Sequence, residues 1–118
     1  MKRVAVTGLG VISPVGNDVP TFWNALCSGT CGIGPITKFD ATDYPVKLAA
    51  EVRDFDPRQY MEKLDILHSD VYTHFAMAAA CQAVADSGIA GTLDAERVGV
   101  YIGSGIGGIA TFMTEHSK

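Results

Sequence analysis

Two runs rich in Val and Ile, at residues 4–12 and 98–102, dominate the hydrophobic pattern of the chain. Neither run alternates regularly between apolar and polar residues, which is typical of strands that are covered on both faces. A turn that contains glycine follows each run, at residues 13–17 and 103–108. The pattern therefore predicts two fully buried strands of a parallel sheet.

Between the two runs the chain predicts a helix and then an irregular insertion. Asp18 is placed to begin the helix, and Gly29 fits the left-handed position after its last turn. Residues 32–35 predict a loop, because glycine and proline are concentrated there. Residues 46–52 predict a short strand of a hairpin-like insertion, and residues 54–67 predict short helical turns on the surface.

A longer helix is predicted over residues 71–87, which contain neither proline nor glycine. Ser69 or Asp70 is placed to cap its start, and Gly88 is placed to end it. The middle of this segment, residues 76–81, carries no charge on any face. A helix without a polar face is typically packed between other elements, so we expect this one to be buried all round.

The order of the predicted elements indicates an α/β fold. A turn at residues 94–97 and a helix over residues 109–117 complete the order strand, helix, insertion, helix, strand, helix. That order is typical of parallel strands joined by right-handed crossovers. Strands buried on both faces need further strands beside them, and the 118 residues contain no other candidates of that kind. We therefore expect an incomplete sheet, and a chain that is a segment of a longer protein.

Composition and charge argue against several classes of protein. Hydrophobic residues make up 47% of the chain and charged residues 19%, as in a globular protein. The formal net charge of −4 argues against binding to nucleic acid or to an anionic membrane. No apolar run approaches the ~20 residues that span a bilayer. The three cysteines have no framework spacing, which is typical of reduced thiols and predicts a cytoplasmic protein.

Few residues suggest chemistry by their spacing alone. His68 and His74 lie on different helical faces, so no metal site is expected. Cys31 has no histidine at a recognisable spacing and Cys81 lies among alanines, so neither is expected to be a nucleophile. Residues 103–108 match the dinucleotide pattern GxGxxG between a predicted strand and a predicted helix. Because this motif usually follows the first strand, nucleotide binding is the less favoured alternative.

Several blocks of sequence, in order along the chain, resemble the β-ketoacyl-acyl carrier protein synthases of the type II kind. The blocks are residues 6–17 (VTGLGVISPVGN), 22–23 (FW) with Leu26, Ser28 and Gly29, 32–33 (GI), 39–40 (FD), 55–57 (FDP), Asp70 with 75–76 (FA) and 78–80 (AAA), and 97–108 (RVGVYIGSGIGG). The last block is the most specific, and together the blocks extend over essentially all 118 residues. By resemblance, residues 1–118 are identified as the N-terminal segment of such a synthase's N-terminal domain, truncated before the catalytic cysteine.

The resemblance implies the thiolase fold, in which two similar α/β halves are stacked in layers and the enzyme forms homodimers. This chain would form the opening part of the first half. In the family a cysteine at a helix N-terminus accepts an acyl group as a thioester. Two histidines then assist the decarboxylation of malonyl-acyl carrier protein, whose carbanion attacks the thioester. The substrate is carried on the phosphopantetheine arm of acyl carrier protein, the implied partner, and no cofactor is expected to be bound by this chain.

The catalytic residues of the family match positions after residue 118, so the resemblance assigns no catalytic residue to this chain and implies that the chain alone is inactive. Two other residues match functional positions. Ile106 matches the isoleucine that borders the acyl-chain pocket and acts as a gate near the dimer interface. Lys63 is the only basic residue of the segment 62–69, where the family commonly carries several that contact the acidic carrier protein. Val71 stands where an arginine is frequent, so the implied contact is weak.

The resemblance implies decarboxylative condensation of malonyl-acyl carrier protein with an acyl thioester in fatty acid elongation, which makes the complete protein an acyltransferase. The alternative within the fold is a polyketide-type ketosynthase or its non-catalytic chain-length partner. The alternative of another class is a nucleotide-binding oxidoreductase module, which would use residues 103–108.

Overall fold

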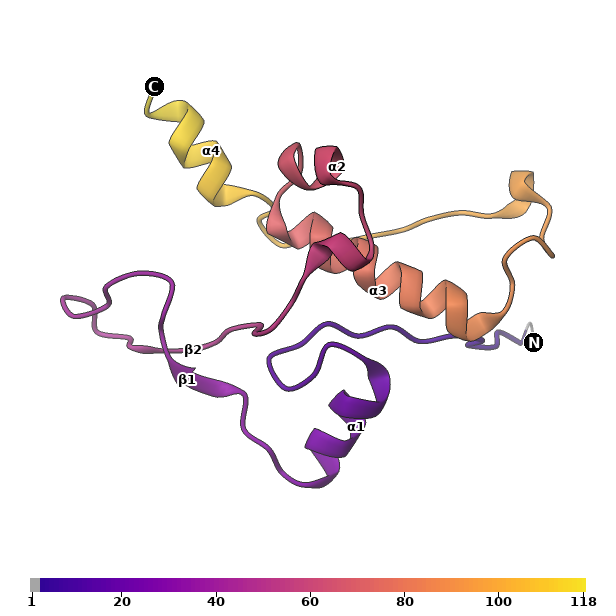
Figure 1. The fold of residues 1–118 in the computed structure, drawn as a ribbon, viewed down its shortest axis with the longest axis horizontal. Helices are drawn as coiled ribbons and strands as arrows, with labels where there is room; N and C mark the ends of the chain where they lie inside the picture. Colours follow the sequence, from indigo (N-terminus) through magenta and orange to yellow (C-terminus); the bar gives the residue numbers. More distant parts are fainter. Residues whose placement is uncertain (1–2) are drawn as a thin grey trace. The chain divides into compact units, whose positions relative to one another are not determined.

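The structure is a computed structural model that describes residues 3–118 (Figure 1). It divides into two compact units, which we call the hairpin unit (Val11–Phe55) and the helical unit (the residues up to Gly10 together with Asp56–Lys118). In chain order the elements are α1 (Val19–Cys27), β1 (Ile33–Pro35), β2 (Leu48–Ala50), the 3-10 helix η1 (Pro57–Gln59), α2 (Lys63–Leu67), α3 (Val71–Ser87), the 3-10 helix η2 (Ala95–Arg97) and α4 (Ile109–His116).

In the hairpin unit, α1 begins where the sequence predicts. Asp18 is its N-cap, and the Asp18 carboxylate accepts hydrogen bonds from the Thr21 amide at 2.7 Å and from the Thr21 hydroxyl at 2.9 Å. Gly29 follows the helix with a φ of 69°, the left-handed region that favours glycine. The predicted start and end of this helix are therefore confirmed.

The same unit contains a small antiparallel sheet. β1 pairs with β2, and Ile33 lies opposite Ala50. The predicted hairpin-like insertion and its strand within residues 46–52 are confirmed. The predicted loop at residues 32–35 is wrong, because β1 lies there. Proline is tolerated at the end of such a strand when the sheet has only edge strands, which explains Pro35.

A buried carboxylate closes this hairpin. Glu51 follows β2 directly and is 9% exposed. Its carboxylate accepts a hydrogen bond from the Thr37 hydroxyl at 2.6 Å and one from the Thr37 amide at 3.1 Å. The hydroxyl bond first, and then the amide bond, hold the pKa of the Glu51 carboxyl below its ordinary value of 4.5.

In the helical unit, α3 spans the predicted range and ends at Gly88, whose φ is 63°. Asp70 is the N-cap residue, but its side chain makes no capping bond to the helix. Within α3 only His74 and Ala78 are buried, so the prediction of a helix buried all round is wrong for the described residues. The helix lacks a polar face, yet all but two of its residues are exposed or half-buried.

The short helical turns predicted within residues 54–67 are confirmed as η1 and α2, and both are tied to α3. The Nε2 atom of the buried His74 lies 3.2 Å from the Ile66 carbonyl oxygen. The side-chain amide of Gln82 donates to the Tyr60 hydroxyl at 3.3 Å. The predicted turn and last helix are likewise present, as η2 and α4.

Neither apolar run forms a strand in the structure, so the prediction of two buried strands is wrong for this chain. The backbone has no regular secondary structure over residues 4–12 and 98–102 (Figure 1). Val4 is 94% exposed and Tyr101 is 97% exposed. A strand needs a hydrogen-bonded neighbour, and among the described residues the only paired strands are β1 and β2.

Candidate functional site

The glycine-rich loop at residues 103–108 leads directly into α4 and carries Ile106. The Ser104 hydroxyl closes the loop on itself by accepting a hydrogen bond from the Gly107 amide at 3.0 Å. Gly107 has a φ of 72°, which favours glycine. Ile106 is 77% exposed. Ile106 therefore projects from a tight, locally bonded turn and not from a core.

The start of α3 contacts the end of this loop. The Asp70 carboxylate accepts a hydrogen bond from the Thr111 hydroxyl in the first turn of α4, and the segment that leads into α4 passes beside the first turn of α3 (Figure 1). The same carboxylate occupies the space that a Cβ on Gly108 would need. The Tyr72 ring lies 3.7 Å from the position of a Cβ on Gly107. Side chains at the start of α3 thus define the path of the chain where the loop ends.

Sequence reasoning assigned Asp70 to the cap of α3 and missed its contact with α4. Asp70 and Thr111 are separated by 41 positions, so no local pattern relates them. The available signal was Gly108, because a second consecutive glycine before a helix often marks a close approach of another group.

This arrangement counts against nucleotide binding at residues 103–108. In dinucleotide-binding proteins the pyrophosphate lies at the helix N-terminus, where the amides and the helix dipole attract an anion. The Asp70 carboxylate lies at the start of α4, so a phosphate would meet a like charge there.

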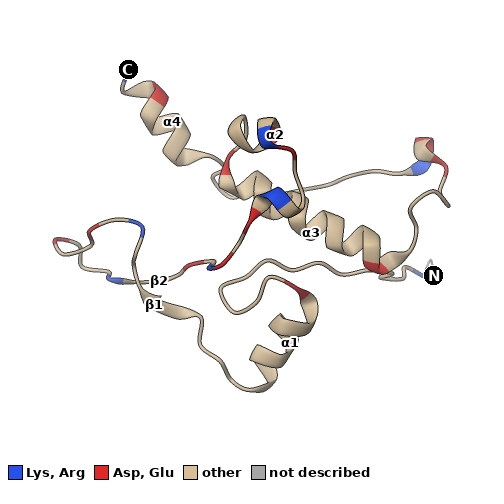
Figure 2. Cartoon of the chain, in the orientation of Figure 1, with Lys and Arg blue, Asp and Glu red and all other residues tan. Residues whose placement is uncertain are grey.

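Lys63, the other residue singled out from the sequence, lies exposed at the start of α2. Glu62 and Asp65 are its acidic neighbours in the same turn. Figure 2 shows few basic residues in this part of the helical unit. Arg58 is bound to Asp56 with an N–O distance of 2.8 Å, and the hydrogen bonds from Arg58 lower the pKa of the Asp56 carboxyl. The surface around α2 is therefore of mixed charge and not a basic patch.

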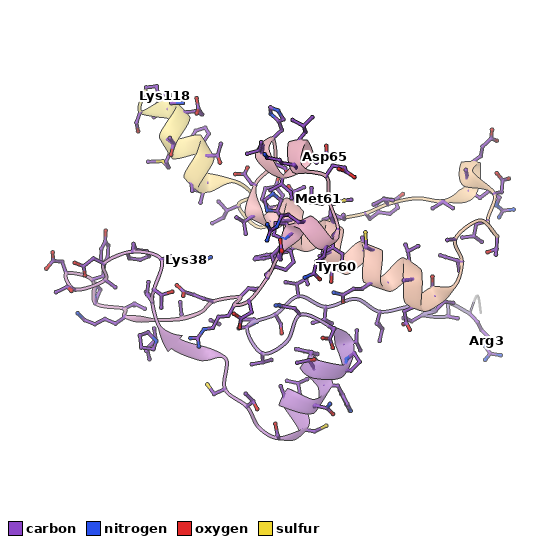
Figure 3. All side chains as sticks on the ribbon, in the orientation of Figure 1. Arg3, Lys38, Tyr60, Met61, Asp65 and Lys118 are labelled. Carbon is purple, nitrogen blue, oxygen red and sulfur yellow. The ribbon has the colours of Figure 1, made fainter. Side chains whose placement is uncertain are left out.

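An open groove of about 670 Å³ lies between η1, α2 and α3 in the helical unit. Figure 3 shows three of its lining residues, Tyr60, Met61 and Asp65, on the segment from η1 to α2. Sequence reasoning missed this groove because its residues come from three separate elements and form no motif. Its lining mixes charged, polar and apolar side chains, and no ligand chemistry follows from it.

The cysteines and histidines form no catalytic or metal-binding cluster in the part of the chain that the structure describes. No group of His, Cys, Asp and Glu side chains among residues 3–118 is placed to hold a metal ion. Cys27, Cys31 and Cys81 are exposed free thiols. Over the same residues, no helix has the length and apolar character that crossing a membrane requires.

Comparisons with known proteins place this arrangement in a family. The family model for the beta-ketoacyl synthase N-terminal domain matches residues 1–118. The chain is 52% identical over 109 residues to 3-oxoacyl-[acyl-carrier-protein] synthase 2 of Coxiella burnetii, a match that covers 92% of the chain and 26% of that protein. It is 47% identical over 117 residues to the protein of the same name from Vibrio harveyi. That match covers 98% of the chain and 28% of the Vibrio harveyi protein.

A solved structure extends the likeness to three dimensions. The ishigamide ketosynthase/chain length factor matches with a TM-score of 0.74 and 30% sequence identity, over 95% of this chain and 29% of that one. The chain is thus an α/β segment of a thiolase-like layered fold with an incomplete sheet, as predicted. It belongs to the β-ketoacyl synthase family. It spans 26–28% of the length of the two curated relatives.

Proposed function

We propose that residues 1–118 form the N-terminal segment of a β-ketoacyl-acyl carrier protein synthase of fatty acid elongation. The observation that carries the proposal is the match of the whole chain to the family's N-terminal domain, together with relatives at 42–52% identity named 3-oxoacyl-[acyl-carrier-protein] synthase 2. The complete enzyme is an acyltransferase that moves an acyl group from its carrier onto a cysteine. It then condenses this thioester with malonyl-acyl carrier protein, and carbon dioxide leaves. The cysteine and the two assisting histidines belong to the part of the family's length beyond residue 118.

Within this enzyme we assign Ile106 to the gate of the acyl-chain pocket. Support comes from the placement of Ile106 on a glycine-rich turn, because the neighbouring glycines leave the backbone free to shift. Its side chain is exposed in this chain, which leaves it available to border a pocket made with other parts of the enzyme.

The partner of the enzyme is acyl carrier protein, whose phosphopantetheine arm carries the substrate. Lys63 contributes a weak contact, because it is exposed and basic but has acidic neighbours. The enzyme acts as a homodimer in the cytoplasm. Free, exposed thiols at all three cysteines are typical of a reducing compartment and support that location.

A polyketide-type ketosynthase or its chain-length partner is the second candidate function. The likeness to the ishigamide ketosynthase/chain length factor supports it, at 30% identity. The higher identity to the 3-oxoacyl-[acyl-carrier-protein] synthases favours the first candidate.

The test uses an enzyme of the family's length that begins with residues 1–118, which we call the family-length enzyme. Given malonyl-acyl carrier protein and an acyl primer, it should form an acyl thioester on its cysteine and release carbon dioxide. The 118-residue chain alone should do neither, even though it has three exposed thiols. A folded family-length enzyme that forms no acyl thioester would support the chain-length partner, and a nicotinamide cofactor that binds to residues 103–108 would support the oxidoreductase alternative.

The gate is tested by Ile106→Phe. Overpacking typically costs ~1 to 3 kcal/mol, which corresponds to roughly 5- to 150-fold weaker use of long primers at about 1.4 kcal/mol per tenfold. Primers too short to reach the gate should be nearly unaffected. Ile89→Phe, after the end of α3, is the matched control and should not alter the ratio of kcat/KM between long and short primers. An unchanged ratio in Ile106→Phe would remove the gate assignment.

A further inference from the structure

We infer that Asp70 is a positioning residue for the gate: its carboxylate links the start of α3 to the start of α4 and so restrains the loop that carries Ile106. The inference rests on the proposed function of Ile106. Its own evidence is the set of contacts at the junction of these two helices.

The first observation is that Asp70 does not do what an N-cap aspartate usually does. An N-cap carboxylate ordinarily accepts hydrogen bonds from the first amides of its own helix, as Asp18 does for α1 through Thr21. Asp70 occupies the same position on α3, and Thr73 again stands three residues later. The Asp70 side chain nevertheless makes no bond to its own helix.

The second observation is where that carboxylate goes. It accepts the hydrogen bond of the Thr111 hydroxyl, in the first turn of α4. α4 has Gly108 as its N-cap residue and therefore has no capping side chain of its own. A negative charge at this end of a helix is favourable, because the first amides and the helix dipole point toward it. Asp70 is the N-cap residue of α3, but its carboxylate provides the favourable negative charge at the start of α4.

The third observation is steric. A Cβ on Gly108 would overlap the Asp70 carboxylate, so this junction needs glycine at that position and leaves little space between the two segments. The ring of Tyr72, two residues after Asp70, lies against Gly107. The loop is thereby anchored at its end, two residues from Ile106, while Gly103 and Gly105 have nothing within 4 Å of a Cβ position.

The loop is therefore anchored at one end and open at the other. Ile106 lies between the anchored and the open parts. Movement of Ile106 away from a long acyl chain must bend the backbone against the anchor. Loss of the hydrogen bond between Asp70 and Thr111 should make this movement easier. The kcat/KM for long primers should therefore rise relative to the kcat/KM for short ones.

The experiment compares kcat/KM for long and short acyl primers in the family-length enzyme. Asp70→Ala should raise the ratio of long to short by about 2- to 12-fold, the equivalent of one hydrogen bond of ~0.5 to 1.5 kcal/mol at about 1.4 kcal/mol per tenfold. Thr111→Val removes the other partner and should give a change of the same sign. The double variant should add little to either single change, because both remove the same bond.

Two further variants separate positioning from a structural role. Asp70→Asn keeps an acceptor oxygen for Thr111 and should hold the ratio near that of the unchanged enzyme. Asp18→Ala removes the cap of α1, where an aspartate also bonds a threonine, and should lower the stability without changing the ratio.

A ratio that stays constant in both Asp70→Ala and Thr111→Val, while Ile106→Phe still changes it, would overturn the inference and leave the gate intact. A ratio that falls in both variants would overturn it as well. If Ile106→Phe also has no effect, the proposed role of Ile106 fails first. Because Thr111→Val leaves the charge at residue 70 in place, it remains decisive even if Asp70→Ala does not fold.

Discussion

Two apolar runs that look alike in the sequence have different surroundings in the helical unit. The first run lies beside α3 over residues 8–10, within the part of the run that belongs to the helical unit. A Cβ on Gly8 or on Gly10 would collide with the backbone of α3, at Ala83 and at Ala79 respectively, so both glycines allow a close approach. Between them the Leu9 amide donates a hydrogen bond of 2.9 Å to the Asp86 carboxylate.

The run at residues 98–102 has no comparable support. Every residue from 91 to 106 is exposed, and the space around a Cβ on Gly103 is empty to 4 Å. Both runs are apolar, but only the first has a described element to pack against. The comparison shows that apolar composition alone does not bury a segment, and that the first run approaches α3 closely at its two glycines. In the family-length enzyme we therefore expect new neighbours mainly at the second run.

The largest expected effect is at the centre of the second run. Val100→Lys in the family-length enzyme would bury a charge without a partner, which costs several kcal/mol, so we expect little folded protein. Val46→Lys in the hairpin unit is the matched control: Val46 is 65% exposed and Val100 is 78% exposed. Soluble yield and thermal unfolding measure the difference. Equal behaviour of the two variants would mean that residues 98–102 are not a buried strand.

A pair of glycine substitutions should give the next largest effect. Gly10→Ala should lower the free energy of unfolding by about 1 to 3 kcal/mol, the usual range for overpacking, because the backbone of α3 must shift. Gly103→Ala should be nearly neutral in the 118-residue chain and should become costly in the family-length enzyme. Urea unfolding followed by circular dichroism in both proteins measures the changes. If Gly103→Ala changes the free energy of unfolding equally in both proteins, the expectation that other parts of the family-length enzyme pack against this segment would be wrong.

A smaller effect should follow from the bond between the first run and α3. Asp86→Ala removes the acceptor of the Leu9 amide and should destabilise by about 0.5 to 1.5 kcal/mol, the net value of one hydrogen bond. Hydrogen exchange at the Leu9 amide should accelerate in the variant, while exchange at the Ile36 amide, bonded to the Lys47 carbonyl at 3.0 Å, should not change. Unchanged exchange at Leu9 would mean that the first run does not rest on α3.

The smallest expected effect lies in the hairpin unit, at the bonds between Thr37 and Glu51. The hydroxyl and amide of Thr37 lower the pKa of the Glu51 carboxyl below 4.5. The stabilisation is therefore present above pH 4.5 and is lost as the pH falls through the lowered pKa. Thr37→Val should reduce stability at pH 7, and the difference from the unchanged protein should shrink in acid. Denaturation from pH 7 to pH 3 tests this, and a difference that grows in acid would contradict the assigned bonds.

The candidate site was only partly predictable from the sequence. Ile106 and Lys63 were identified by resemblance to the family, and their roles remain proposals. The link between Asp70 and Thr111 could not be predicted, because residues so far apart in sequence become partners only when α3 and α4 are placed side by side.

The sequence by itself determined the ends of the longer helices. Asp18, Gly29 and Gly88 set the ends of helices through interactions within a few residues, and α3 has the bounds that were predicted. Only the tertiary structure decided what these elements pack against. The predicted strands did not form, since backbone hydrogen bonds in a sheet come from other segments and no described segment pairs with either run. Burial likewise depends on neighbours, which is why only two residues of the apolar helix α3 are buried in this chain.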